Sequence, residues 1–332
     1  MGLRDLFANN PNIIINTDID GILSGVLLVK YLGCRIVGFS NSQDKVWLSD
    51  DYDDLYKHVY IDMFVTDDRA LCVDQHIVAI NAEHQQRIIQ SGTKYSPQIE
   101  GNRIFTKKDF ENKYPFGTTQ YIIASLEEEG ITVTLPHLDT PVPNSTIKVG
   151  DLIHRADDAM RSTLYNYVPN SKNWWKWLKE KSRDAQSISD LIDYLLSIPK
   201  KTGYKMDKKD VGMKNYVDDI KKKTGKYFKD TFSCTKDDGD FKDITDESGN
   251  VLSKFQQYVS AIGNIMNCQG VVIPNHYKTH TGKAYRTRWL DFFEEDFLRD
   301  YTFFGHKIFS YAFIYGPDND GVTNWSFTVD ME

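Results

Sequence analysis

The chain has 332 residues, of which 40% are apolar and 26% are charged, so we predict a globular protein with room for two domains. Its formal net charge of −7 argues against a protein whose whole surface binds polyanions. The four cysteines include no CxxC pair, which argues against a disulfide framework or a zinc ribbon. The first residues lack the apolar core of a signal peptide and no run of 18 apolar residues occurs, so we expect a cytoplasmic protein with no membrane partner.

The first predicted element is a buried strand over residues 12–15, which leads directly into the motif Asn16-Thr17-Asp18-Ile19-Asp20-Gly21. Side chains alternate along an extended segment, so two carboxylates two residues apart point the same way. The glycine then permits a turn into a helix predicted over residues 22–32. Acids placed in this way suit metal ligation at the carboxyl end of a strand. An Asx turn that caps the helix is the alternative.

Short apolar runs continue at residues 35–39, 59–64 and 70–74 and alternate with polar or helical segments. This alternation predicts a mostly parallel sheet that is covered on both faces. Two of these runs carry an acid at or near the end, Asp62 and Asp74. Three predicted strands therefore deliver carboxylates at their ends.

Later segments are predicted by their apolar spacing and by their glycine and proline boundaries. Helices are expected over residues 117–130, 149–159, 189–198, 250–267 and 290–299, and strands over residues 271–273, 307–315 and 323–329. The last two strands are expected to form a hairpin. Residues 172–230 contain 16 Lys or Arg against 9 Asp or Glu, which marks a basic segment in an acidic protein.

The expected fold class is therefore α/β, with a parallel, doubly wound sheet in an N-terminal domain over residues 1–165. A basic helical connector follows over residues 166–230. A smaller α+β domain that binds substrate is expected over residues 231–332.

A set of polar residues arrives in the order and spacing of a known family: Asp18, Asp20, Asp62, the triplet Asp74-Gln75-His76, and Asp157. Over roughly residues 10 to 165 the chain resembles the DHH phosphoesterases, and its first motif looks most like the RecJ form. The segment Phe116-Gly117-Thr118 falls where that family starts a helix with glycine and threonine. This family includes RecJ-type exonucleases, nano-RNases, cyclic-dinucleotide phosphodiesterases and family II pyrophosphatases.

The resemblance implies two Mn²⁺ or Mg²⁺ ions in one active site, and carboxylate oxygens suit these ions better than Zn²⁺. It implies that Asp62 bridges the ions, that Asp18 binds one of them, and that Asp20 and Asp157 bind the other. Asp158 is an alternative ligand to Asp157. Four close acids would disfavour one another's ionisation without cations, which also argues for bound metal.

Two positions depart from the family pattern. Gln75 stands where the family has a metal-binding histidine, and Asn16 stands where the RecJ form has an acid. Both keep an oxygen ligand of weaker donor strength, so an active enzyme and a catalytically silent binder both remain open. By the resemblance, His76 contacts the scissile phosphate or donates a proton near it, and Asp74 orients that loop.

A second candidate site lies in the window from residue 248 to residue 290, which contains no Asp or Glu. Basic residues alternate there with aromatic ones, a pattern that favours phosphate contacts and base stacking. The residues expected to bind substrate are His276, Lys278, Lys283, Arg286 and Arg288. The glycine-rich motif of the family's C-terminal module is missing, which leaves the substrate's identity open.

The run Trp174-Trp175-Lys176-Trp177 is interpreted as a helix anchor in the core rather than as a base-stacking surface. The leading hypothesis is a Mn²⁺- or Mg²⁺-dependent phosphodiesterase, a RecJ-like exonuclease, that hydrolyses single-stranded DNA or RNA or short oligonucleotides. A phosphohydrolase of cyclic or linear dinucleotides is one alternative. A catalytically silent nucleotide-binding protein of the same fold is another.

Overall fold

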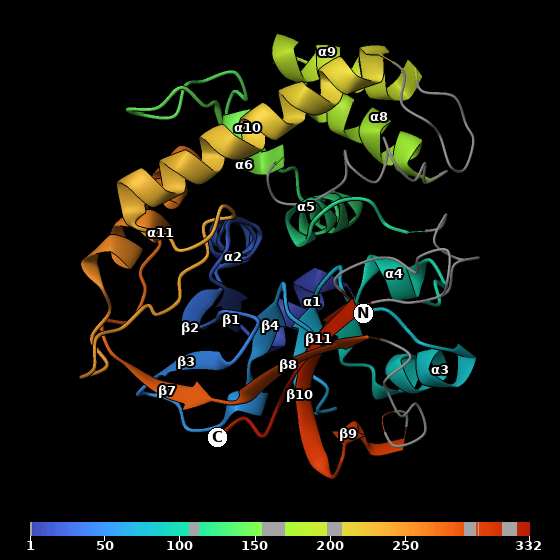
Figure 1. Cartoon of the computed structure of the whole chain (residues 1–332), viewed down its shortest axis with the longest axis vertical. Coiled ribbons are helices and arrows are strands. Elements are labelled where there is room, and N and C mark those ends of the chain that lie inside the picture. The colour runs from blue at the N-terminus through green and yellow to red at the C-terminus, as the bar shows by residue number, and fades with distance from the viewer. Residues whose placement is uncertain are drawn as a thin grey trace.

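The computed structural model describes residues 2–105, 113–154, 170–197, 208–288, 297, 299–313 and 324–332. Its larger sheet has seven strands in the order β6-β5-β4-β1-β2-β3-β7 (Figure 1). The strands are β1 (Asn12–Asn16), β2 (Arg35–Ser40), β3 (Lys45–Ser49), β4 (Val59–Ile61), β5 (Leu71–Val73), β6 (Lys94–Tyr95) and β7 (Tyr277–Thr281). The first five strands in that order, β6 to β2, run parallel; β3 is antiparallel to β2, and β7 is antiparallel to β3. The protein is therefore of the α/β class, with a mostly parallel sheet.

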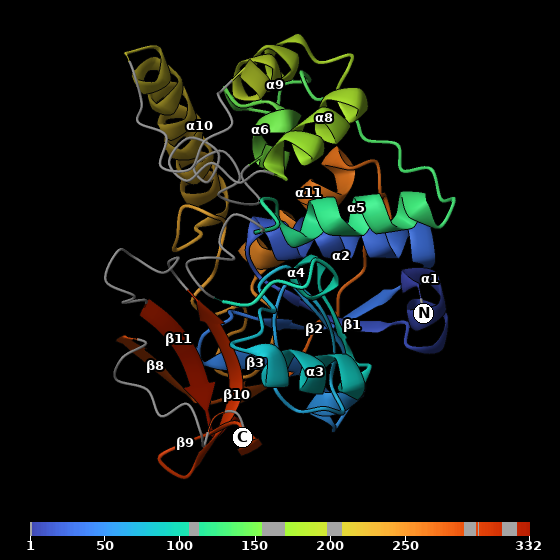
Figure 2. The ribbon, with the colours of Figure 1, turned by 90° about the vertical axis from the view of Figure 1, so that its right-hand side faces the viewer.

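Helices α2, α5 and α11 pack with one face of this sheet in a single apolar core (Figure 2). The helices are α1 (Leu3–Asn9), α2 (Ile19–Leu32), α3 (Ala82–Ser91), α4 (Pro97–Glu100), α5 (Thr118–Glu128), α6 (Val149–His154), α8 (Ser171–Lys181), α9 (Gln186–Ser197), α10 (Lys208–Phe232) and α11 (Ser253–Ile265), with a 3-10 turn at Leu55–Lys57. In β1, Ile13 and Ile15 face this core, whereas Ile14 faces a second core on the other side. Burial on both faces explains why β1 is apolar throughout.

The second face of the large sheet is covered by α3 and by a small antiparallel sheet of order β8-β11-β10-β9. Its strands are β8 (Lys283–Arg288), β9 (Thr302–Phe303), β10 (His306–Phe313) and β11 (Asn324–Val329). Trp325, Phe327 and Val329 alternate along β11 and point into the second core, because strand side chains repeat with period two. The predicted pairing of the last two strands is confirmed, since β10 and β11 are antiparallel neighbours.

Gly282 joins β7 to β8, so one ribbon forms an edge of both sheets. A Cβ atom at Gly282 would lie 2.6 Å from Thr328 Cγ2 and 2.9 Å from the carbonyl oxygen of Val329. Only glycine fits this close approach. The segment after residue 231 shares both cores with the N-terminal segment, since α11 packs on α2 and β7 pairs with β3. The three-part division of the chain stays a prediction.

One predicted strand is wrong and one interpretation is confirmed. Residues 271–273 form no strand in the described part of the chain, and Val272 is 80% exposed just before Pro274. Trp175 is buried at 1% exposure and Trp174 packs edge-on to Tyr114, so this run anchors α8 in the core as interpreted. The segment 290–296 and the turn at 316–321 lie outside the described residues. Among the helices that the structure describes, none is long and apolar enough to cross a bilayer.

Candidate metal centre

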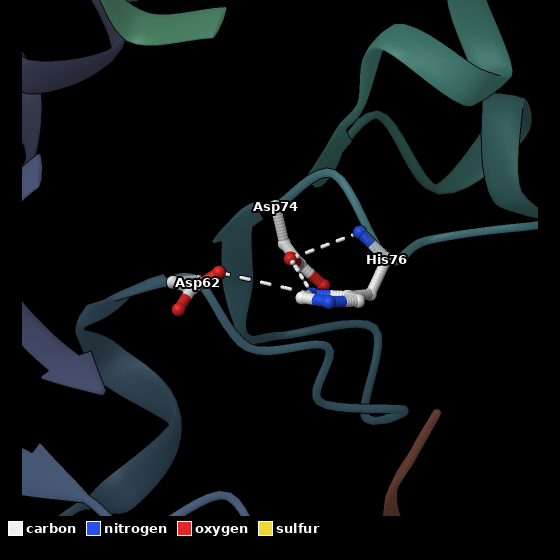
Figure 3. A group of neighbouring side chains, drawn as sticks. All are labelled: Asp62, Asp74 and His76. Atoms are coloured by element: carbon white, nitrogen blue, oxygen red, sulfur yellow. Dashed lines mark hydrogen bonds and ion pairs between the residues drawn. The ribbon is translucent and has the colours of Figure 1, made fainter. Parts of the chain in front are cut away.

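Asp62, Asp74 and His76 form a compact cluster at the carboxyl ends of β4 and β5 (Figure 3). The two strands are parallel neighbours, so the residues that follow them meet at one edge of the sheet. His76 Nδ1 lies 2.8 Å from Asp74 Oδ1 and 3.7 Å from Asp62 Oδ1. One donor atom from each residue lies within 4.8 Å of the others, and no other such group of His, Cys, Asp and Glu occurs in the described residues.

Asp62 is held in a fixed position by its backbone and by two side-chain contacts. Its φ of 60° lies in the left-handed region, which costs energy for a residue with a side chain. Thr118 Oγ1 donates to Asp62 Oδ1 at 2.9 Å, and Asn16 Nδ2 donates to Asp62 Oδ2 at 3.2 Å. An acid in place of Asn16 would instead repel Asp62.

Asp20 lies against the N-terminus of α5. The backbone N–H groups of Thr118 and Thr119 each donate to its carboxylate at 2.8 Å, and Thr119 Oγ1 donates at 2.6 Å. A carboxylate in this place satisfies the free N–H groups of the first helical turn and interacts favourably with the helix dipole. The structure thus places Asp20 as the cap of a second helix, and its predicted role as a metal ligand stays a prediction.

Asp18 caps its own helix, as the alternative interpretation of the first motif proposes. It precedes α2 and accepts a 3.0 Å hydrogen bond from the backbone N–H of Gly21 through Oδ1. It also lines the same pocket as Asp62 and His76. The two interpretations of this motif are therefore compatible, because one residue both caps the helix and faces the pocket.

Gln75 contacts His76 directly. Its Nε2 lies 2.6 Å from His76 Nε2, while His76 Nδ1 faces Asp74. Since an amide nitrogen only donates, this arrangement requires a proton on His76 Nδ1 and a lone pair on Nε2. The backbone N–H of Gln75 also donates to Thr118 Oγ1 at 3.3 Å. Gln75 therefore orients the histidine, and its predicted role as a ligand stays a prediction.

The acids of the site raise one another's pKa values. Burial, and after it Asp238 and Asp20, raise the pKa of Asp18 to about 8. Burial, then Asp20, Asp18 and Asp74, raise the pKa of Asp62 well above its ordinary value. Desolvated carboxylates that repel one another are stabilised by a cation, because its charge compensates theirs.

Sequence reasoning missed Asp238 and Asp240, which reach the site from the loop after α10. The backbone N–H of Ile19 donates to the carbonyl oxygen of Asp238 at 2.9 Å, and Thr17 Oγ1 donates to the carboxylate of Asp240. The run Asp237-Asp238-Gly239-Asp240 is a recognisable acidic turn. Its distance from the first motif in the sequence gave no reason to connect the two.

A pocket of about 220 Å³ lies between the acidic cluster and the small sheet. Its residues include Asp18, Asp62 and His76 on one side and Ser310, Ser326 and Thr328 on the other. Ser310 pairs directly with Thr328 across β10 and β11, so both side chains leave the same face of the small sheet. This face is polar, whereas the opposite face of β11 is apolar and buried.

The five predicted substrate-binding residues lie on or just before the ribbon β7–β8, but they fall into separate groups. His276 pairs with Asp50 at 2.5 Å and Lys278 pairs with Asp53 at 2.8 Å, both at the edge of the large sheet. Their acidic partners offset the positive charge that was predicted to contact phosphate.

Arg286 is the predicted residue whose register places it over the pocket. It stands opposite Ser326, a pocket residue, so the two share a sheet face. Arg288 stands opposite Asn324 on that same face. Lys283 stands opposite the core residue Val329, on the other face. Register therefore separates the two arginines from the lysine.

Asp157 and Asp158 lie outside the described residues, so the fourth motif stays a prediction. Comparisons of the chain with protein-family models, curated proteins and solved structures gave no significant match. The resemblance to the DHH phosphoesterases accordingly rests on the motifs themselves.

Proposed function

We propose that this protein is a phosphodiesterase dependent on Mn²⁺ or Mg²⁺ that hydrolyses single-stranded nucleic acid or short oligonucleotides. The observation that carries the proposal is a pair of buried oxygen atoms without hydrogen-bond partners among the described residues, Asn16 Oδ1 and Asp74 Oδ2. Both residues line the pocket, beside Asp62 and His76. Buried hydrogen-bond acceptors normally have partners, so two acceptors without partners in an acidic pocket favour a bound cation.

The donor set fits a hard divalent cation. Asp62, Asp74 and Asp18 offer carboxylate oxygens, and Asn16 offers an amide oxygen. Such oxygen-rich sets suit Mg²⁺ and Mn²⁺, while the described residues of this pocket include one histidine and no cysteine, which disfavours zinc. When bound, such ions polarise the phosphoryl oxygen and lower the pKa of a water nucleophile.

The protein's own residues then have distinct tasks. Thr118 and Asn16 fix the two oxygens of Asp62 so that its lone pairs keep one orientation. Asp74 binds the Nδ1 side of His76, whose side chain is 42% exposed and borders the pocket. Nε2 of His76 is suited to transfer a proton to or from an oxygen of the phosphodiester bond. Gln75, which contacts this nitrogen, must first move aside.

The side of the pocket formed by the small sheet favours a substrate that carries phosphate and sugar groups. Ser310, Ser326 and Thr328 offer hydroxyl groups to a phosphate or sugar, and Arg286 lies on their sheet face. A volume of about 220 Å³ suits one nucleotide unit rather than a whole drug-sized ligand, so a longer substrate would leave the pocket along β8. Tyr285 lies on the other face of that strand, where its ring stacks on Phe327, so it does not face the pocket.

Labelled single-stranded DNA and RNA of several lengths, incubated with Mn²⁺ or with EDTA, test this proposal. We expect nucleotide release with Mn²⁺ alone, faster turnover of longer strands, and a rate that falls steeply with salt. Equal or better hydrolysis of a dinucleotide with a weak salt dependence would favour the dinucleotide phosphohydrolase. Folded protein that binds Mn²⁺ and releases no product would favour the catalytically silent binder.

A further inference from the structure

The loop after α10, residues 233–240, reaches back to the first motif and is anchored on both sides of Asp18. Thr17 precedes this acid and binds Asp240, and Ile19 follows it and binds the backbone of Asp238. These two contacts bring the loop beside the start of α2. An acid that is more than two hundred residues away in sequence therefore becomes a neighbour of Asp18.

The two carboxylates of this loop have different surroundings. Asp240 forms an ion pair with Lys236 and accepts the hydroxyl of Thr17, so its charge is compensated. Asp238 Oδ1 has a long contact of 3.4 Å with the backbone N–H of Asp240. The hydrogen bond from the backbone of Ile19, the residue that follows Asp18, to the carbonyl oxygen of Asp238 places these two acids beside each other at the start of α2.

The hydroxyl group of Tyr258 is an independent indication of a ligand beside the loop of residues 233–240. Its side chain is completely buried in α11, and its hydroxyl has no hydrogen-bond partner in the described part of the chain. A Cβ atom built at Gly239 would lie 2.3 Å from Tyr258 Oη and 3.7 Å from the backbone nitrogen of Ile19. The hydroxyl thus points at the loop between Asp238 and Asp240. A buried phenol without a partner destabilises the folded protein, and a bound ligand would recover that loss.

We propose that Asp18 and Asp238 share a hydrated divalent cation, with the hydroxyl of Tyr258 hydrogen-bonded to water of its hydration shell. The inference rests on the proposed function, because this ion would be the second of the two that the phosphodiesterase uses. Mg²⁺ and Mn²⁺ are commonly held by one or two carboxylates and several waters. Asp238 then supplies the negative charge that the sequence assigns to Asp20, which is engaged with α5.

Calorimetric and electron paramagnetic resonance titrations with Mn²⁺ test the site without any substrate. The full chain is expected to bind two ions, and Asp238→Asn is expected to bind one. Asp237→Asn is the matched control, since Asp237 is the exposed neighbour that pairs with Lys229 at 2.5 Å, and it should still bind two. Two ions bound to Asp238→Asn with unchanged affinity would overturn the proposal.

Tyr258→Phe tests the same site without the removal of a charge. Because its hydroxyl has no hydrogen-bond partner among the described residues, we expect the metal-free variant to unfold at the same or a higher temperature than the parent. We expect its affinity for one of the two Mn²⁺ ions to fall about tenfold, as for other partners of metal-bound groups. Unchanged affinity at both sites would contradict the proposal.

The outcomes separate this inference from the proposed function. Binding of two Mn²⁺ ions, one of which is lost in Asp238→Asn, by a protein without nuclease activity would support the site and refute the activity. Mn²⁺-dependent hydrolysis by a protein whose two ions are indifferent to Asp238 would support the activity and refute the site.

Discussion

Thr118 Oγ1 donates a 2.9 Å hydrogen bond to Asp62 Oδ1, while the backbone N–H of the same residue binds Asp20. One residue at the start of α5 thus connects Asp62, which follows β4, with Asp20 in the first turn of α2. Helix α5 is a positioning element for the candidate metal centre, because a shift of its first turn would move both carboxylates.

This relationship predicts different results for two neighbouring substitutions. Thr118→Val removes the hydroxyl that orients Asp62 and should weaken Mn²⁺ binding about 10–100-fold. Thr119→Val removes a hydroxyl that contacts Asp20 and Ser24 but not Asp62, so it should lower the free energy of unfolding by about 1–2 kcal/mol with little change in Mn²⁺ affinity. Calorimetry and urea denaturation measure both quantities. Equal effects of the two substitutions on Mn²⁺ affinity would show that the Asp62 contact has no special role.

The pKa of Asp18 predicts how stability depends on pH. This carboxyl group ionises near pH 4 in the unfolded chain, and burial and Asp238 raise its pKa in the folded state to about 8. Between these values the folded protein keeps a proton that the unfolded chain has lost, so the free energy of unfolding of the metal-free protein falls as pH rises through this window.

Asp18→Asn should flatten this dependence. Denaturation in EDTA at about pH 5 and about pH 8 measures how much the free energy of unfolding falls in the parent and in Asp18→Asn. The difference between these two decreases is the contribution of Asp18. Mn²⁺ should also reduce the decrease in the free energy of unfolding of the parent, since the bound cation replaces the proton of Asp18. If the free energy of unfolding changes with pH by the same amount in the parent and in Asp18→Asn, the pKa of Asp18 is not raised in the folded protein.

The register of β8 predicts that two basic residues three positions apart differ in function. Arg286→Ala should weaken binding of a single-stranded oligonucleotide and reduce the salt slope by about one unit. Lys283→Ala is the matched control, because Lys283 lies on the opposite sheet face. This substitution should change the affinity for the oligonucleotide by less than about twofold, since the side chain contacts no phosphate. Fluorescence anisotropy over a range of salt concentrations measures both. A larger loss for Lys283→Ala would show that substrate follows the other face.

Gly282 predicts a cost in stability where the two sheets join. Gly282→Ala would place a methyl group 2.6 Å from Thr328 Cγ2 and should destabilise the protein by about 1–3 kcal/mol. Adding Thr328→Ser removes that methyl group and should restore part of the loss. Urea denaturation of the single and double variants measures the coupling. Full stability of Gly282→Ala would mean that the ribbon adjusts freely at this point.

The sequence was sufficient to predict the acidic edge of the large sheet. The apolar strands β1, β4 and β5 each end near an acid, and they are parallel neighbours in the order β5-β4-β1. Parallel strands bring their carboxyl ends to one edge, so the alternation of apolar runs with helices, which predicts such a sheet, also predicts that the acids at these strand ends lie near one another. The local signals and the global fold agree there.

Contacts between distant segments were not predictable in the same way. Strand β8 reads Lys-Ala-Tyr-Arg-Thr-Arg, with five of its six residues exposed, so it lacks the apolar alternation that marks a strand. Asp238 reaches the site because α10 returns the chain to α2, a packing event without a local signature. The strand predicted over residues 271–273 failed for the converse reason, since its apolar run carries an exposed valine and ends at a proline.

We propose that the cluster at Asp62 supports phosphodiester hydrolysis. Release of nucleotides from a labelled single-stranded oligonucleotide, compared between the parent protein and Asp62→Asn in Mn²⁺, tests it most directly. The substitution keeps the shape of the side chain and removes its charge. We predict Mn²⁺-dependent product from the parent and at least about a hundredfold lower rate from the folded variant, as expected for loss of a metal-binding carboxylate. Equal rates from both proteins, or no product from folded parent protein, would contradict the account.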